Sequence, residues 1–478
     1  MMDAHTVMNP ESSLSLADKS QGSNHTHFMG IEGAGMFALA ELFRQRGEIV
    51  TGCDVAPGEN SEQLRSAGVE ISGKHDTSHL SDATSVVVSS AVPWGTKEIQ
   101  EALTRGIPVI KRAEALGQCV NHGQVLAVSG THGKTTTTAM VTEILDIAGM
   151  NPTGVAGGHV FSWGGNFLMG GDLYVVEADE YDRSFLELQP NIAIVTNIEP
   201  DHLDCYHHFD EVISAFIQFL ESLPPEGTAV VCADDRVASS VVHGLQVQKI
   251  SYGLSPGSEL RATEVRQIDG GVEFSLLERG INCGSFKINS LGLHNLLNSL
   301  AAVASSRSLG VSWESIREGL NSFGGVKRRF ETIGFHKDIL VIDDYAHHPS
   351  EVLATLTAAK TAYPSRRLVA AFQPHLFSRT RDFATDFGES LCVADEIWVT
   401  DVFASREDPI EGVTGELITC HIEKLGRMVR YTADMNELPG QLIEFLEPSD
   451  LFMTLGAGSI RQVSEEVELL LRERYSSE

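Results

Sequence analysis

The chain has 478 residues, of which 42% are hydrophobic, and a formal charge of −30 at neutral pH. Its length predicts roughly three domains, and its acidic balance argues against nucleic acid or an anionic membrane as a partner. The seven cysteines form no C-x-x-C pair, so their spacing indicates neither a zinc site nor a disulfide framework, and a reducing cytoplasm is expected. The sequence contains no run of 18 or more apolar residues, so no transmembrane helix is expected. Residues 1–26 lack an apolar signal core, and we expect a disordered tail there.

A Rossmann-like domain is predicted over residues 27–122. Its elements in chain order are a strand with a glycine turn, a helix and two further strands, at residues 27–36, 37–46, 48–52 and 85–89. The second of these strands is followed by Asp54 and the third by Ser90. This order is typical of a nucleotide-binding unit. Glu32 stands at the second glycine of G-x-G-x-x-G, so a structural turn and a ligand site are about equally favoured by the residues alone.

The central domain, expected over residues 123–327, opens with a phosphate-binding loop of the short form Gly-x-x-Gly-Lys-Thr. The loop residues are Gly130, Thr131, His132, Gly133, Lys134, Thr135 and Thr136. The glycines let backbone N–H groups approach an anion, and the following helix adds its dipole. Lys134 would reach the outer phosphates of ATP, and the Thr135 hydroxyl would ligate Mg²⁺. A glycine turn that merely caps a Thr-rich helix is disfavoured, because an apolar strand and a helical run flank the loop as the motif requires.

Polar clusters follow two later strands of the central domain. The predicted elements are strands at 173–176, 192–196 and 228–231, an antiparallel patch at 264–288 and a helix at 293–309. Glu177 follows the first strand and is the preferred second ligand for Mg²⁺, with Asp179 and Glu180 as competitors. His202 follows the second strand, where a structural histidine and a metal ligand are equally favoured.

A second Rossmann-like pattern is predicted over residues 328–478. Its strands are expected at 339–342, 368–372, 397–399 and 451–454. Histidine and arginine residues follow several of these strands, and His375, Arg379 and Arg381 follow the strand at 368–372. Each arginine taken alone could be a surface salt-bridge partner, but together these strand ends could hold a carboxylate or a phosphate. The residues thus suggest a ligase in which ATP activates a carboxylate and an amine displaces the phosphate. A P-loop switch protein that binds nucleotide without ligation is the alternative of another class.

These motifs resemble those of the Mur ligases, from about His27 to the C-terminal helix. The matching runs are residues 27–36, 130–138, 177–186, 196–206, 292–302, 325–331, 343–352, 372–382 and 455–459. The resemblance implies an α/β protein of three domains: a Rossmann-like N-terminal domain for a UDP-sugar, a central ATPase-type domain and a Rossmann-like C-terminal domain for an amino acid.

The resemblance also implies roles for single residues. It assigns Lys134, Glu177 and His202 to catalysis, and Thr135, Glu177 and His202 to metal binding. In addition to the loop, it places at ATP the residues His294, Asn295, Arg329, Asp344 and His347. It places at the substrates the residues Gly33, Gly35, Met36, Asp54, Ser90, His375 and Arg379.

Within the family, the motifs are most similar to the member that joins L-alanine to the carboxylate of UDP-N-acetylmuramate. The implied reaction passes through an acyl phosphate, uses ATP and Mg²⁺, releases ADP and phosphate, and belongs to cytoplasmic peptidoglycan precursor synthesis. A monomer or weak homodimer is expected. Tyr181 is shared with the related ligase that recycles murein tripeptide, which is the alternative enzyme. Glu32, Leu376 and Ser459 depart from the common family pattern.

Overall fold

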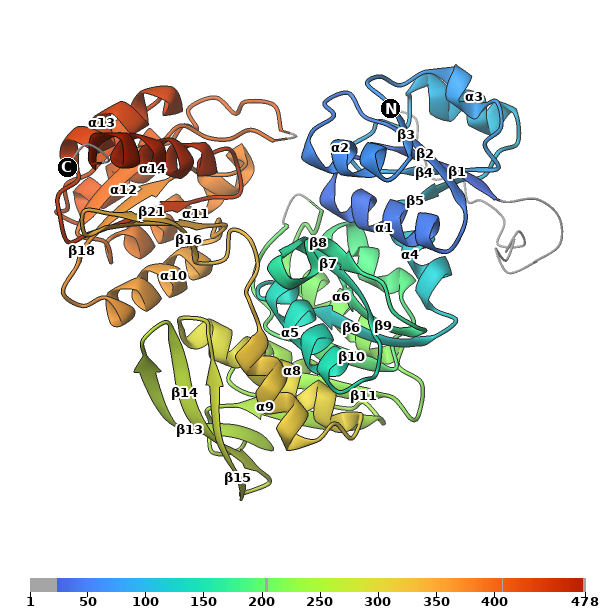
Figure 1. The fold of residues 1–478 in the computed structure, drawn as a ribbon, viewed down its shortest axis with the longest axis horizontal. Helices are drawn as coiled ribbons and strands as arrows, with labels where there is room; N and C mark the ends of the chain where they lie inside the picture. Colours follow the sequence, from blue (N-terminus) through green and yellow to red (C-terminus); the bar gives the residue numbers. More distant parts are fainter. Residues whose placement is uncertain (1–23, 203–204, 406, 476–478) are drawn as a thin grey trace. The chain divides into compact units, whose positions relative to one another are not determined.

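The computed structural model describes residues 24–202, 205–405 and 407–475 (Figure 1). They form two compact units: one comprises the described residues up to Gln124 with Glu187–Gln189, and the other comprises the rest. Three β-sheets are present among these residues, one in the first unit and two in the second. The predicted α/β architecture is therefore confirmed. No helix in this part of the chain is both long and apolar enough to cross a membrane.

The first unit is built on a parallel five-stranded sheet in the order β3-β2-β1-β4-β5. Its elements are β1 (His25–Met29), α1 (Ala34–Gln45), β2 (Ile49–Cys53), α2 (Glu59–Ser66), β3 (Glu70–Ser72), η1 (Thr77–Leu80), β4 (Ser85–Val88), α3 (Lys97–Thr104), β5 (Val109–Lys111) and α4 (Arg112–Val120). All four residues of β4 are buried, as expected for a strand covered on both faces. Because β1 starts at His25, residues 25 and 26 belong to the sheet and not to the predicted tail, whose residues 1–23 lie outside the described part.

The central sheet has ten strands in the order β15-β14-β13-β12-β11-β10-β6-β9-β7-β8. Its elements are β6 (Gln124–Ser129), α5 (Lys134–Ile147), β7 (Thr153–Val160), η2 (Phe161–Trp163), β8 (Gly165–Leu168), β9 (Leu173–Glu177), η3 (Tyr181–Glu187), β10 (Ile192–Val195), α6 (Phe209–Glu221), β11 (Thr228–Cys232), α7 (Arg236–Val241), β12 (Gln248–Gly253), β13 (Leu260–Ile268), β14 (Gly271–Glu278), β15 (Ile281–Ile288), α8 (Leu293–Ser308) and α9 (Trp313–Ser322). The antiparallel patch expected over residues 264–288 is confirmed as β13 to β15. Helix α5 packs on α8 and α9 over a continuous apolar core that includes Met140, Ile144 and Leu300.

The third sheet has the order β16-β17-β21-β18-β19-β20, and only its edge strand β16 runs antiparallel to its neighbour. Its elements are β16 (Glu331–His336), β17 (Ile339–Asp344), α10 (Pro349–Ala362), β18 (Arg367–Phe372), α11 (Phe377–Leu391), β19 (Glu396–Thr400), α12 (Glu416–Lys424), β20 (Arg430–Thr432), η4 (Met435–Glu437), α13 (Leu438–Phe445), β21 (Asp450–Leu455) and α14 (Arg461–Tyr475). Apolar clusters lie on both faces of this sheet, as the predicted Rossmann-like pattern requires. The predicted boundary between residues 327 and 328 falls between α9 and β16 and stays a prediction, because the two sheets belong to one compact unit.

Candidate active site

The phosphate-binding loop joins β6 to α5, and its two glycines have no room for a side chain. Gly130 and Gly133 have φ values of 131° and 83°. A Cβ atom on Gly130 would lie 2.0 Å from the Thr196 hydroxyl, and one on Gly133 would lie 2.3 Å from the Asn298 amide oxygen. Helix α5 begins directly after Gly133, and no side chain caps its first turn. Its backbone N–H groups are thus oriented for an anion, which supports the predicted loop.

Lys134 is anchored inside this loop and paired with an acidic residue. Its ammonium group donates to the carbonyl oxygens of Gly130 (2.8 Å) and Thr131 (3.2 Å) and to both carboxylate oxygens of Glu180 (3.0 and 2.9 Å). Burial opposes the charged form of Lys134, but the charge of Glu180 raises its pKa above the usual range. Lys134 therefore carries a positive charge at neutral pH, held at the position where the motif places the outer phosphates.

A cluster of two carboxylates and the predicted metal ligand His202 lies beside Lys134. One ligand atom each from Asp179, Glu180 and His202 lies within 4.8 Å of the others. His202 Nδ1 is buried and has no hydrogen-bond partner among the described residues, while its Nε2 lies 3.7 Å from Glu180 Oε1. The two carboxylates offer the oxygen ligands that Mg²⁺ prefers, and the imidazole adds a nitrogen donor beside them. Glu177, the preferred ligand from the sequence, is not in this group, and its carboxylate accepts from the backbone N–H of Gly157.

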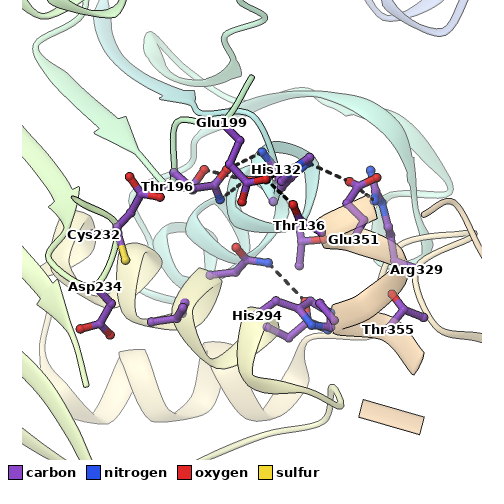
Figure 2. A pocket seen from close by; sticks show the side chains of 18 of the residues that line it. His132, Thr136, Thr196, Glu199, Cys232, Asp234, His294, Arg329, Glu351 and Thr355 are labelled. Carbon is purple, nitrogen blue, oxygen red and sulfur yellow. Dashed lines mark hydrogen bonds and ion pairs between the residues drawn. The ribbon is translucent and has the colours of Figure 1, made fainter. Parts of the chain in front are cut away.

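A pocket of about 270 Å³ opens next to the loop (Figure 2). Seven of the predicted ATP residues line it: His132, Gly133, Thr136, His294, Asn295, Arg329 and Asp344. They come from the loop, the N-terminal end of α8 and the start of the third sheet region, segments that are far apart in sequence. The structure therefore brings most of the predicted nucleotide residues into one pocket.

Sequence analysis missed several residues that line the same pocket. They are Thr196, Glu199, Cys232, Asp234, Asp235, Tyr252, Leu297, Asn298, Ser350, Glu351, Ala354 and Thr355. Asn197, which also lines the pocket, was expected from its place after the strand at 192–196. Asp234 and Asp235 directly follow the predicted strand that became β11, so the rule that polar strand ends form sites would have found them. Asn298 and Glu351 lie on the faces of α8 and α10, and no local pattern distinguishes them from other helix residues.

His294 and Arg329 give the pocket its electrostatic character. His294 Nδ1 is buried and has no hydrogen-bond partner among the residues that the structure describes. Burial and the nearby charge of Arg329 lower the pKa of His294 to about 4, so its imidazole is neutral at physiological pH. A neutral imidazole with an unused nitrogen is suited to a hydrogen bond with an uncharged ring such as a nucleobase.

Glu351 of α10 connects the third sheet region to the phosphate loop. Its carboxylate lies 3.2 Å from His132 Nδ1 and 3.5 Å from the Arg329 guanidinium. It also accepts from the backbone N–H of His347. Burial opposes protonation of His132, but the charge of Glu351 raises the pKa of His132 to about 9. His347 itself does not line the pocket; its ring contacts the ring of His375.

The predicted amino-acid residues His375 and Arg379 lie close to Asp201, the neighbour of His202. Arg379 donates to the Asp201 carboxylate at 2.6 Å, and both side chains are buried. Burial by itself raises the pKa of Asp201, but the Arg379 charge holds it well below its usual range. His375 lies 3.5 Å from the same guanidinium. A small hollow next to this pair is lined by Asp201, His202, Leu376, Ser378, Arg379, Asp382 and Phe383.

Three family models match the chain in order. The Mur ligase family catalytic domain matches residues 25–124, the Mur ligase middle domain matches 128–306, and the Mur ligase glutamate ligase domain matches 328–458. The chain belongs to the Mur ligase family. Its curated relatives include the UDP-N-acetylmuramate–L-alanine ligases of Salinibacter ruber, 43% identical over 93% of this chain and 94% of theirs, and of Geobacter sulfurreducens, 42% identical over 92% and 96%.

Solved structures similar to this Mur ligase include two other ligases. The UDP-N-acetylmuramate-alanine ligase of Thermotoga maritima has a TM-score of 0.80 and 30% identity, over 95% of this chain and 99% of its own. A murein peptide ligase from Psychrobacter arcticus has a TM-score of 0.70 and 26% identity, over 94% and 99%. The predicted family and fold are thus confirmed.

In the first unit of this Mur ligase, the predicted sugar residues gather at the carboxyl ends of the strands. Gly33, Gly35 and Met36 lie at the start of α1, and Asp54 and Ser90 follow β2 and β4. The side chain of Met36 is buried in the core, so only its backbone is available to a ligand. The assignment of all five to the UDP-sugar stays a prediction.

The departure at Glu32 has a structural explanation. Its carboxylate accepts from the backbone N–H groups of Gly58 (2.8 Å), Asn60 (3.2 Å) and Ser61 (2.9 Å) at the beginning of α2. Its own backbone N–H donates to Asp54. Glu32 thus supplies the cap that α2 lacks at Gly58 and fastens the turn after β1 to this helix.

Proposed function

We propose that this Mur ligase joins L-alanine to the carboxylate of UDP-N-acetylmuramate, with ATP converted to ADP and phosphate. The observation that carries the proposal is the position of Asp201 and His202. His202 faces Glu180 and, through it, Lys134 of the phosphate loop, whereas the adjacent Asp201 is paired with Arg379. One loop thereby connects the triphosphate position to the predicted amino-acid position, as a two-step amide ligase requires.

In the first step the muramoyl carboxylate attacks the γ-phosphorus of ATP, giving an acyl phosphate and ADP. The loop N–H groups and Lys134 would stabilise the charge on the phosphoryl oxygens, while His294 and Asn295 would hold the adenine side. Thr135, Glu177 and His202, the ligands predicted from the sequence, would hold Mg²⁺ together with Asp179 and Glu180, which lie beside His202. Mg²⁺ supplies charge neutralisation at the phosphates when bound.

In the second step the neutral amine of L-alanine attacks the acyl carbonyl. The tetrahedral adduct expels phosphate, and the amine loses a proton as the amide forms. Arg379 and His375 would orient the amino acid, with the guanidinium close to its carboxylate. Because Asp201 already neutralises Arg379, the alanine carboxylate would share this arginine with Asp201.

Phosphate release with substrates omitted one at a time tests the proposal. Release should require ATP, UDP-N-acetylmuramate and L-alanine together, and ¹⁸O from the muramoyl carboxylate should appear in the released phosphate. Turnover with murein tripeptide but not with L-alanine would instead identify the recycling ligase. Slow ATP hydrolysis that neither substrate stimulates would identify a nucleotide-binding switch protein.

We further propose that the reaction takes place in the cytoplasm, where nucleotide-linked precursors are available. A monomer or weak homodimer remains our prediction for the oligomeric state. Sedimentation velocity at several protein concentrations would decide between these two forms.

A further inference from the structure

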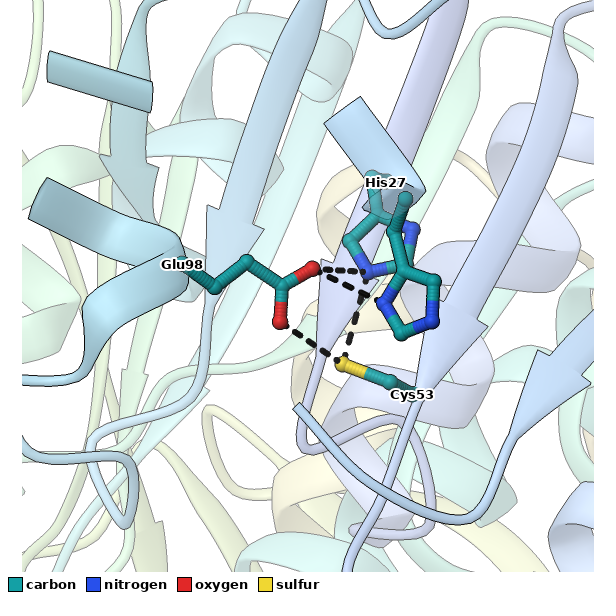
Figure 3. Close-up of side chains that lie close together, drawn as sticks. His27, Cys53 and Glu98 are labelled. Atoms are coloured by element: carbon teal, nitrogen blue, oxygen red, sulfur yellow. Dashed lines mark hydrogen bonds and ion pairs between the residues drawn. The ribbon is translucent and has the colours of Figure 1, made fainter. Parts of the chain in front are cut away.

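A buried group of metal-ligating side chains lies in the first unit, where none of the proposed ligase chemistry takes place. His27, Cys53, His79 and Glu98 each contribute one nitrogen, sulfur or oxygen atom, and these atoms lie within 4.8 Å of one another. Figure 3 shows His27, Cys53 and Glu98 pointing toward a common centre. From this arrangement we propose that the first unit binds a structural Zn²⁺ ion through these four side chains.

The distances between the donor atoms suit tetrahedral zinc. Zn–N and Zn–O bonds of about 2.0 Å and Zn–S bonds of about 2.3 Å place neighbouring ligand atoms ~3.2 to 3.6 Å apart. His27 Nε2 lies 3.2 Å from Glu98 Oε1 and 3.3 Å from Cys53 Sγ. His79 Nδ1 lies 3.0 Å from Glu98 Oε1, and Cys53 Sγ lies 3.7 Å from Glu98 Oε2. A cation could therefore enter with only small side-chain movements.

The donor set also matches zinc in charge and chemical character. Two neutral imidazoles, one thiolate and one carboxylate carry two negative charges, which Zn²⁺ balances. Binding would displace the thiol proton of Cys53 to solvent. Mg²⁺ and Ca²⁺ prefer oxygen donors, so a site with a sulfur and two nitrogens discriminates against them.

A second layer of contacts orients His27 for this role. Its Nδ1 lies 2.9 Å from the Thr51 hydroxyl, which leaves Nε2 directed at the cluster. Hydrogen bonding of the non-ligating ring nitrogen is the usual way in which a metal-binding histidine is oriented. His75 Nδ1 lies 3.0 Å from Cys53 Sγ and provides a further contact on the outer side.

The site has an entry path and a structural consequence. The side chains of His27, Cys53 and Glu98 are fully or almost fully buried, whereas His79 is 15% exposed and His75 is 18% exposed, so the histidines form the outer wall. The four ligands come from β1, β2, η1 and α3. The Cys53 carbonyl oxygen accepts from the backbone N–H of Gly30 at 2.8 Å, so an ion here would brace the turn that precedes α1.

Cobalt substitution of the full-length protein tests the proposal directly. After removal of metal with a chelator, Co²⁺ should produce a thiolate-to-cobalt absorption band at one equivalent per chain, and Zn²⁺ should abolish the band. The Cys53→Ser variant should lose the band, and Cys119→Ser, which removes another buried thiol of the same unit, should keep it.

A milder variant covers the case in which Cys53→Ser does not fold. His79→Gln replaces the most accessible ligand and should weaken Zn²⁺ binding by at least ~10-fold, since loss of even an outer-shell partner costs ~10- to 100-fold, while the circular dichroism spectrum is unchanged. Zinc should raise the unfolding temperature of the native protein but not of this variant. The proposal is overturned if the native protein gives no thiolate band, or if bound zinc is unaffected by His79→Gln. The first result would identify the cluster as a hydrogen-bonded network without metal, and the second would show that His79 is not a ligand and that the four-ligand site does not exist.

Discussion

Arg379 on α11 and Asp201 in the loop after β10 form a buried ion pair with a separation of 2.6 Å. The pair connects the third sheet region to the central sheet, directly beside His202. A buried pair of this kind contributes little net energy when intact, but removal of one partner leaves an uncompensated charge. The Arg379–Asp201 ion pair therefore fixes the position of the loop that carries His202, and it contributes little to the stability of the chain as a whole.

Removal of Arg379 alone should be more harmful than removal of both partners. Arg379→Ala leaves the Asp201 carboxylate buried without its cation, at a cost of about 3 kcal/mol or more, which should lower the thermal unfolding midpoint by several degrees. The double variant with Asp201→Ala should recover part of this loss. Arg381→Ala is the matched control, because the Arg381–Asp382 pair is largely exposed and its loss should change the midpoint very little. Equal effects of the two single arginine variants would contradict the buried ion pair.

Lys134→Ala should abolish ligation without affecting the first unit. Loss of the Lys134 ammonium group should reduce kcat by about 10³-fold or more, because its charge no longer compensates the charge on the phosphoryl oxygens. Binding of UDP-N-acetylmuramate, measured by isothermal titration calorimetry, should persist. A Lys134→Ala variant with native turnover would contradict the assignment of the loop.

Gly133→Ala should disrupt the loop far more than an alanine at another left-handed glycine. A Cβ on Gly133 would meet Asn298 Oδ1 at 2.3 Å, whereas one on Gly149, where φ is 73°, has nothing within 4 Å. Both substitutions carry the backbone cost of about 1 kcal/mol. Only Gly133→Ala should also weaken ATP binding, by at least tenfold in an equilibrium titration. Similar ATP affinities for the two variants would show that the close packing on Asn298 is unimportant.

Glu32→Ala should loosen the beginning of α2. The backbone N–H groups of Gly58, Asn60 and Ser61 would lose their acceptor, a cost of about 1 kcal/mol, which corresponds to roughly fivefold faster hydrogen exchange there. Glu62→Ala is the control, because Glu62 is exposed and pairs with Arg65 on the same helix. If these three amides exchange no faster in Glu32→Ala than in Glu62→Ala, Glu32 does not cap α2.

The neutral His294 should make the folded state sensitive to acid. Its folded pKa is about 4, below the ordinary value of 6.5, so as pH falls below 6.5 the unfolded chain binds a proton that the folded chain does not. Stability should therefore decrease between about pH 6.5 and pH 4, by up to ~1.4 kcal/mol per pH unit for this group. In His294→Asn, the unfolding free energy should depend less steeply on pH near pH 5, because about one proton fewer is taken up on unfolding. An unchanged slope in thermal or urea unfolding would show that His294 is already protonated in the native protein.

The sequence by itself indicated the phosphate loop and the positions of many strands. Gly130 and Gly133 lie between a strand and a helix, which is the order of elements in a phosphate loop. Four of the predicted apolar strands are present as β9, β10, β17 and β18. Polar residues at the ends of parallel strands lie at one edge of a sheet, and this rule pointed to Glu177, His202 and Arg379. His294, Asn295 and Arg329 came from the family resemblance.

Only the tertiary structure decided which of these residues meet. Glu177 was the preferred Mg²⁺ ligand after β9, with Asp179 and Glu180 as competitors, and it is these two competitors whose carboxylates lie close to His202. Glu180 also pairs with Lys134. The His27–Cys53–His79–Glu98 cluster joins residues from four elements with no local spacing, and cysteine spacing had indicated no zinc site. Local patterns specify helices, strands and turns, whereas contacts between distant side chains depend on packing that no short stretch of sequence contains.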